Sequence, residues 1–130
     1  MQRMILGGAL GLGLAACATV PPGLMPSGWQ VVSLAGRDLG ADDRVTIDFA
    51  EGRVSGISGC NRYTGPVTVS EDGAIAFGLL ATTRMACAGD PPEIEDAFVE
   101  AIGTVDRFQV VRGDLVLLAG DEAVIRAERD

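Results

Sequence analysis

Two short stretches of the sequence carry the residues best able to do chemistry. GCNRYTG (59–65) and TTRMACAG (82–89) each contain one cysteine and one arginine. Two thiols supply only half of a tetrahedral metal shell, and the chain has no histidine to complete it. The 26 residues between Cys60 and Cys87 do not suit the exchange chemistry of a C-x-x-C pair. A structural disulfide between these two cysteines is therefore the favoured interpretation.

The basic residues exclude several kinds of catalytic site. All 10 of them are arginine, so the chain has neither lysine nor histidine. Without these residues there is no Ser–His or Cys–His couple, no Schiff base and no P-loop lysine. The 18 acidic residues lie mostly in predicted turns and on one helix face, as on a solubilising surface. We therefore predict no catalytic residue, no metal site and no cofactor, and the net charge of −8 argues against nucleic acid as a partner.

The N-terminus has the features of an export signal. Arg3 precedes an uncharged run, Met4–Ala16, that is too short to span a bilayer. The run ends in LAAC (14–17), which resembles the bacterial lipobox. That resemblance implies that residues 1–16 are a lipoprotein signal peptide and that Cys17 becomes the lipidated N-terminus. Ala18, in place of an aspartate, favours sorting to the outer membrane, on its periplasmic face.

Removal of the signal peptide leaves one domain behind a tether. With Cys17 carrying lipid, Cys60 and Cys87 remain as an even pair in an oxidising compartment. Residues 17–27 contain three prolines and are expected to form the tether. Residues 28–130 are expected to form the domain.

The pattern of the domain is mostly that of short strands. Apolar residues alternate, or run briefly, between turn signals, which is typical of a sandwich or barrel. Residues 91–105 break this pattern with apolar residues at helical spacing, after an Asp90-Pro91 start signal. We expect a mainly β, antiparallel barrel-like domain with one amphipathic helix over about 91–105. The seven or eight predicted strands cover residues 28–34, 45–49, 53–57, 67–69, 74–78, 107–111, 115–118 and 123–127.

The two cysteine stretches also resemble a family signature. Gly59-Cys60-Asn61, followed by Thr83-Arg84-Met85-Ala86-Cys87, is similar to the paired motifs of the META domain, the HslJ-like family of bacterial envelope proteins. The resemblance extends over residues 28–128. It implies a small barrel-like fold in the periplasm or at the cell surface, and a link to heat shock, novobiocin resistance or virulence-associated motility. It implies no particular molecular activity.

The arginines beside the cysteines suggest a binding patch. If Cys60 and Cys87 are linked, Arg62 and Arg84 lie near each other and can receive an anion or a carboxylate of a partner. Tyr63 is expected to pack one face and expose its hydroxyl, and Asn61 to form part of the same patch. The alternative is that both arginines pair with surface acids.

These observations lead to one leading function and two alternatives. The chain is expected to be a non-enzymatic, monomeric, lipid-anchored module that binds a protein or a small anion in the envelope. The first alternative is a purely structural envelope domain without a ligand. The second is an enzyme, which would require a concave site with convergent polar groups.

Overall fold

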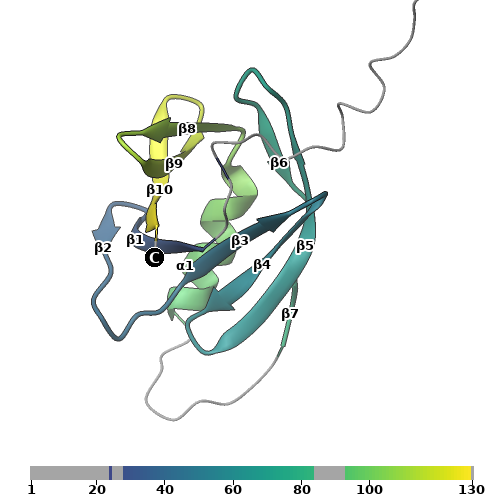
Figure 1. The fold of residues 1–130 in the computed structure, drawn as a ribbon. Helices are drawn as coiled ribbons and strands as arrows, with labels where there is room; N and C mark the ends of the chain where they lie inside the picture. Colours follow the sequence, from purple (N-terminus) through teal and green to yellow (C-terminus); the bar gives the residue numbers. More distant parts are fainter. Residues whose placement is uncertain (1–23, 25–27, 84–92, 130) are drawn as a thin grey trace, which may run out of the picture.

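A computed structural model describes residue 24 and residues 28–83 and 93–129 of the chain. Figure 1 shows strands surrounding one helix, α1 (Glu93–Thr104). The strands are β1 (Trp29–Leu34), β2 (Arg37–Asp38), β3 (Thr46–Ala50), β4 (Arg53–Ser58), β5 (Asn61–Val69), β6 (Ile75–Phe77), β7 (Ala81–Thr82), β8 (Arg107–Val111), β9 (Asp114–Ala119) and β10 (Glu122–Arg129).

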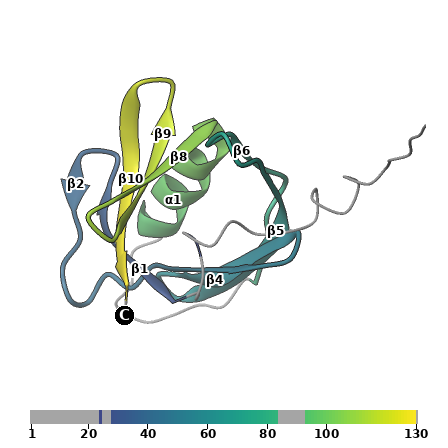
Figure 2. The same ribbon diagram turned by 45° about the horizontal axis from the view of Figure 1, so that its top comes forward.

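The strands form one antiparallel sheet that nearly closes on itself. Its order is β6-β5-β4-β3-β1-β10-β9-β8, with β2 paired to β1 and β7 paired to β5. The two ends of this path meet at a bridge between Ala74 and Arg107. There the Phe108 N–H donates to the Gly73 carbonyl at 2.9 Å, and the Ile75 N–H donates to the Asp106 carbonyl at 3.2 Å. The sheet therefore has the form of a nearly closed eight-stranded barrel (Figure 2).

Tight turns with positive φ set the register of neighbouring strands. Arg112 and Gly113 connect β8 to β9 with φ values of 54° and 86°, as a two-residue type I′ hairpin requires. Gly59 has φ 75° and begins the two-residue turn between β4 and β5, which pair from Ser58 and Asn61 onward. Glycine at this first position is typical of a type II′ turn. The GCN motif is therefore a hairpin turn and the start of a strand.

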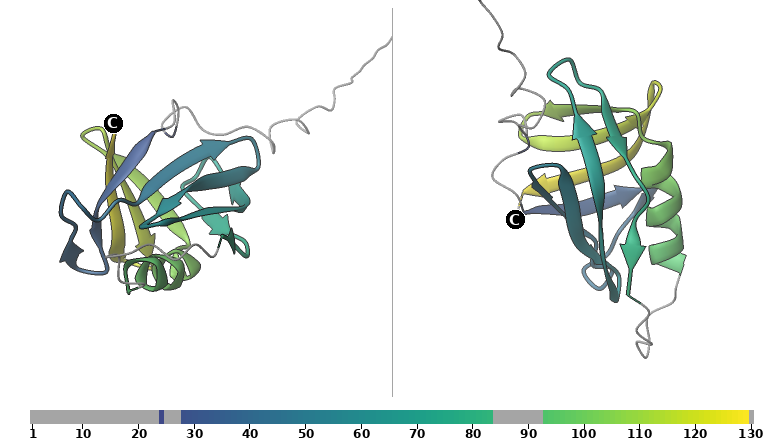
Figure 3. Two further views of the ribbon diagram at one scale, coloured as in Figure 1. Left: turned by 90° about the horizontal axis from the view of Figure 1, so that it is seen from below. Right: turned by 90° about the vertical axis from the view of Figure 1, so that its right-hand side faces the viewer.

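Helix α1 lies across one end of the barrel (Figure 3). It contacts β1, β4 and β10. Its buried side chains are Ile94, Phe98, Ala101 and Ile102, which recur at helical spacing and face the sheet. Glu93, Glu95 and Asp96 in the first turn place negative charge where the helix dipole favours it. The helix thus supplies the apolar surface that fills this end of the barrel.

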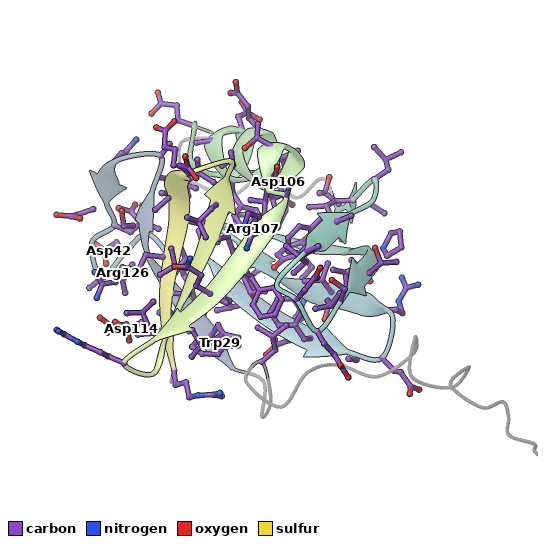
Figure 4. All side chains as sticks on the ribbon, turned by 90° about the horizontal axis from the view of Figure 1, so that it is seen from above. Trp29, Asp42, Asp106, Arg107, Asp114 and Arg126 are labelled. Carbon is purple, nitrogen blue, oxygen red and sulfur yellow. The ribbon has the colours of Figure 1, made fainter. Side chains whose placement is uncertain are left out.

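The core also includes a residue from the predicted tether. Leu24 is fully buried, and its carbonyl accepts a hydrogen bond from the Trp29 indole N–H at 3.3 Å. The Arg129 guanidinium lies 4.2 Å from the centre of the Trp29 ring, in a cation–π contact. Figure 4 shows Trp29 among the side chains at this part of the barrel. The packed domain therefore begins at least as early as Leu24.

The predicted fold class is confirmed. Each of the eight predicted strands falls within or overlaps a strand of the main path, and the two-residue strand β2 was not predicted. The helix predicted over 91–105 is observed at Glu93–Thr104, whereas its start signal at Asp90 and Pro91 lies outside the described residues. In the part of the chain that the structure describes, no helix is long and apolar enough to cross a membrane.

Candidate functional site

The cysteines and one of the two predicted arginines lie partly beyond what the structure describes. Cys17, Arg84 and Cys87 are outside the described residues. Cys60 is half-buried in the turn after β4. Its predicted pairing with Cys87 and the predicted lipid on Cys17 stay predictions.

Asn61 braces the sheet against the helix. Its side-chain amide donates to the Glu95 carboxylate at 2.6 Å. Its side-chain oxygen accepts from the Thr83 hydroxyl at 3.1 Å, and that hydroxyl in turn accepts from the Arg62 N–H at 3.0 Å. Both the nitrogen and the oxygen of the Asn61 side chain therefore form hydrogen bonds within the domain, and these bonds connect β5 to α1 and to the residue after β7.

The expectation that Tyr63 exposes its hydroxyl is wrong. The side chain is 3% exposed, and its hydroxyl donates to the Thr46 carbonyl at 2.7 Å. The ring packs against Phe98 of α1 with 5.1 Å between ring centres. Burial, with a smaller contribution from the Asp48 carboxylate, raises the pKa of Tyr63 well above its ordinary value. Tyr63 is thus a neutral brace in the core, because its strand position points inward between Arg62 and Thr64.

The Tyr63 hydroxyl bonds to β3 where this strand changes partner. Thr46 and Ile47 pair with β1, whereas the next residue, Asp48, pairs with β4. At this split the Ile57 N–H donates to the Thr46 hydroxyl oxygen at 3.0 Å rather than to a carbonyl. The Thr46 carbonyl is then free to accept from Tyr63. A side chain therefore completes the hydrogen bonding that the separating strands leave open.

Gly56 permits this close approach. A Cβ atom built at this position would lie 2.2 Å from the Thr46 carbonyl oxygen, which is too short for any real contact. The φ of Gly56 is not positive, so the requirement concerns space and not backbone conformation. The physical reason for glycine at this position is the passage of β3 next to β4.

The outer face of β3, β4, β5 and β7 is hollowed into a groove of about 560 Å³. Neighbouring strands contribute polar side chains to it, because the apolar positions of the same strands face the core. The hydroxyls of Thr46, Ser55 and Thr64 and the half-buried Ile57 lie in its wall. The complete lining is Gly28, Arg44, Thr46, Asp48, Ser55, Gly56, Ile57, Arg62, Tyr63, Thr64, Ala81, Thr82 and Thr83.

The charged side chains of the groove do not neutralise one another. Arg44 and Arg62 are exposed, and Asp48 is half-buried. Within the described part of the chain, no ion pair of 4.0 Å or less joins any two of these three residues. By contrast, Arg126 on β10 pairs with Asp114 on β9 at 2.7 Å; both residues are labelled in Figure 4. With respect to the residues that the structure describes, the groove therefore presents charges of both signs that have no ion-pair partner.

The sequence predicted one arginine of this groove and missed its other charged residues. Arg62 lies in the groove as part of the predicted patch, whereas Asn61 and Tyr63 are engaged in the interior. Asp48 lies on β3 and Arg44 lies just before it, and nothing in the sequence indicates that this segment is beside Arg62. The alternation in VTIDF (45–49) marks Thr46 and Asp48 as one outward face, but only the strand order shows which face they join.

The described residues offer no obvious metal site. Among them, no group of three or more histidine, cysteine, aspartate or glutamate side chains is close enough to hold a metal ion. The buried side-chain nitrogens and oxygens in this part of the chain all have hydrogen-bond partners. The geometry that remains for function is the open groove with its hydroxyls and charges.

Fold and groove together define a small barrel-like β domain with a groove of polar and charged residues on its outer wall. The sequence model of the META domain family matches residues 23–130. The chain therefore belongs to the META domain family. A comparison with curated protein sequences found no match.

Two solved structures are similar to this chain in fold. One is an NMR structure of a protein from Burkholderia xenovorans, with 24% sequence identity and a TM-score of 0.63, covering 87% of this chain and 93% of the other. A second NMR structure, also with 24% identity and a TM-score of 0.63, covers 85% of this chain and 95% of the other. At this level of identity the likeness supports the fold alone.

Proposed function

We propose that this chain is a lipid-anchored META-domain protein of the bacterial envelope, and that it acts by binding a ligand rather than by catalysis. The binding site is the groove on the outer face of β3, β4, β5 and β7. The observation that carries the proposal is the set of charges in this groove, Arg44, Arg62 and Asp48, that form no ion pair with any described residue. Charged groups left unpaired beside hydroxyls in a shared hollow are suited to charge-assisted hydrogen bonds with a ligand.

The anchor is supported by the LAAC sequence at 14–17 and by the position of Leu24. Leu24 belongs to the core, and only six residues, or seven Cα–Cα steps, separate it from Cys17. Even a fully extended chain of that length spans no more than about 25 Å. A lipid on Cys17 would therefore hold the barrel close to the periplasmic face of the outer membrane.

Mass spectrometry of the membrane fraction tests the anchor. The mature N-terminal peptide should begin at Cys17 and carry acyl chains, whereas a Cys17→Ala variant should lose them and leave the membrane. An unmodified Cys17 in membrane-derived protein would contradict the anchor, without bearing on the groove.

A thermal-shift comparison in cells tests the binding. A ligand that binds only the folded state raises its melting temperature, so the chain should melt at a higher temperature in intact cells than after purification. The Arg44→Ala/Arg62→Ala double variant should lose this difference. Arg126→Ala removes an exposed arginine of another wall and should keep it. Crowding acts alike on the wild type, the double variant and Arg126→Ala, so equal shifts of the melting temperature in all three would contradict the binding proposal.

The second candidate function is a purely structural envelope domain. Its support is that Asn61 and Tyr63, both placed in the predicted binding patch, act as internal braces. This candidate predicts the same melting behaviour for the groove variant and for Arg126→Ala. It also predicts that only variants that destabilise the fold impair the envelope.

A further inference from the structure

The charges of the groove lie in a fixed arrangement on one face of the sheet. On β3, Ile47 and Phe49 face the core, so Asp48 faces outward, as does Arg44 at the same parity before the strand. On β5, Tyr63 faces the core, so Arg62 faces outward. All three charged side chains therefore project from the same outer surface.

The register of the strands gives their spacing. Asp48 pairs with Ser55, and Ser55 pairs with Thr64, which forms one row across β3, β4 and β5. Ile57 pairs with Arg62 in the next row on the same face. Rows on one face are about 6.7 Å apart and neighbouring strands about 4.8 Å, so the Cα atoms of Asp48 and Arg62 lie about 12 Å apart. Arg44, four residues before Asp48, lies on the same side of the Asp48–Ser55–Thr64 row as Arg62.

Among the residues that line the groove, a carboxylate thus stands at one end and two guanidinium groups stand toward the other, while Arg53, outside the lining, donates to the Thr64 hydroxyl at 3.0 Å. A simple anion would be repelled by Asp48, and a simple cation by the two arginines. A ligand that carries both charges, separated by several ångströms, would satisfy both ends at once. An extended peptide of three residues spans about 10 Å between its terminal groups, which suits this separation once the side chains reach inward.

We propose that the groove binds short zwitterionic peptides, with the free ammonium at Asp48 and the free carboxylate at Arg62 and Arg44. This inference rests on the proposed function, because it names the ligand class of the same groove. Ser55 and Thr64 lie between the charged ends. The Ser55 hydroxyl serves the peptide amides, the Thr64 hydroxyl accepts from Arg53 and can donate to a peptide carbonyl, and Ile57 offers apolar contact to a small side chain. The groove volume of about 560 Å³ falls in the usual range of small-ligand sites.

Titration calorimetry with trialanine and its capped forms tests this ligand class. The whole chain, purified in detergent, should bind trialanine at least tenfold more tightly than N-acetyl-trialanine or trialanine amide, because a charge-assisted hydrogen bond is lost with each cap. Arg62→Ala should weaken binding of trialanine at least tenfold and remove the discrimination against the amide. Asp48→Asn should remove the discrimination against the acetylated peptide. Arg126→Ala should bind as the wild type does.

The peptide inference and the binding proposal can fail separately. Equal affinity for free and capped peptides, or no heat of binding up to millimolar peptide, would overturn the inference. If the thermal shift in cells still depended on Arg44 and Arg62, the groove would keep its binding role and lose only this ligand class. Circular-dichroism melting of each variant checks that a lost affinity does not come from unfolding.

Discussion

Replacement of Gly56 by alanine should destabilise the domain strongly. The new Cβ atom would lie 2.2 Å from the Thr46 carbonyl oxygen, roughly 1 Å inside the ~3.3 Å approach that carbon and oxygen allow. Moving β3 away costs about 1–3 kcal/mol in overpacking, and about 1 kcal/mol more if the Tyr63 hydrogen bond to Thr46 is lost. The expected sum is about 2–4 kcal/mol, or a fall in melting temperature of roughly 10–20 °C.

Urea denaturation and thermal melting measure this loss, and a second glycine provides the control. Gly103 lies in α1 with no atom within 4 Å of a built Cβ. Gly103→Ala should therefore leave stability unchanged or raise it by about 0.5–1 kcal/mol, since alanine is the better helix former. A Gly56→Ala variant as stable as the wild type would show that β3 and β4 do not pack as closely as described.

A double-mutant cycle with Tyr63→Phe tests the reason for the loss. Tyr63→Phe alone should cost about 1–3 kcal/mol, because it leaves the buried Thr46 carbonyl without its donor. Both substitutions act on the same carbonyl, so their effects should overlap by at least about 0.5 kcal/mol. Strict additivity would refute the view that Gly56 and Tyr63 serve one contact.

Three further predictions concern the core and the braces. Leu24→Ala should lower the unfolding free energy by about 2–5 kcal/mol in urea denaturation, whereas a residue of a mere tether would have no effect. Asn61→Ala should cost about 1–3 kcal/mol, because it removes the hydrogen bond to Glu95, and hydrogen exchange should quicken in α1 before it does in β8–β10. Tyr63 is the single tyrosine, so its absorbance reports its ionisation alone. Burial raises the pKa of Tyr63, so the stability that this residue gives is complete below its unfolded pKa of ~10 and is lost as pH rises above that value. Tyrosinate should therefore appear together with unfolding. Tyrosinate in the folded domain would contradict the burial of Tyr63.

Much of the fold could be predicted from local patterns. The alternation in VTIDF (45–49) and the turn signal at Glu51-Gly52 predict a hairpin that the structure confirms as β3 and β4. The apolar spacing after Pro91 predicts the helix, because its buried stripe must face the sheet. These features depend on neighbours in the sequence, which is why the sequence alone is enough to find them.

The groove could not be predicted in the same way. It depends on the order β5-β4-β3, which brings Arg62 to the same outer face as Arg44 and Asp48. Tyr63 was wrongly placed in the binding patch, because a tyrosine hydroxyl is expected to be exposed unless a buried hydrogen-bond acceptor for it is known. That acceptor, the Thr46 carbonyl, exists only because β3 changes partner at this residue. Leu24 was likewise assigned to the tether, because its proline-rich surroundings carry no sign of the barrel that it helps to fill.

Photo-cross-linking in living cells tests most directly whether the groove is the binding site. A photoreactive amino acid replaces Ser55, which is exposed in the groove, or Gln109, which is exposed on β8 in another part of the barrel. The account predicts one discrete adduct from position 55, no such adduct from position 109, and loss of the position-55 adduct when Arg44 and Arg62 are both replaced by alanine. The same adducts from both positions, or a position-55 adduct that survives loss of both arginines, would contradict it.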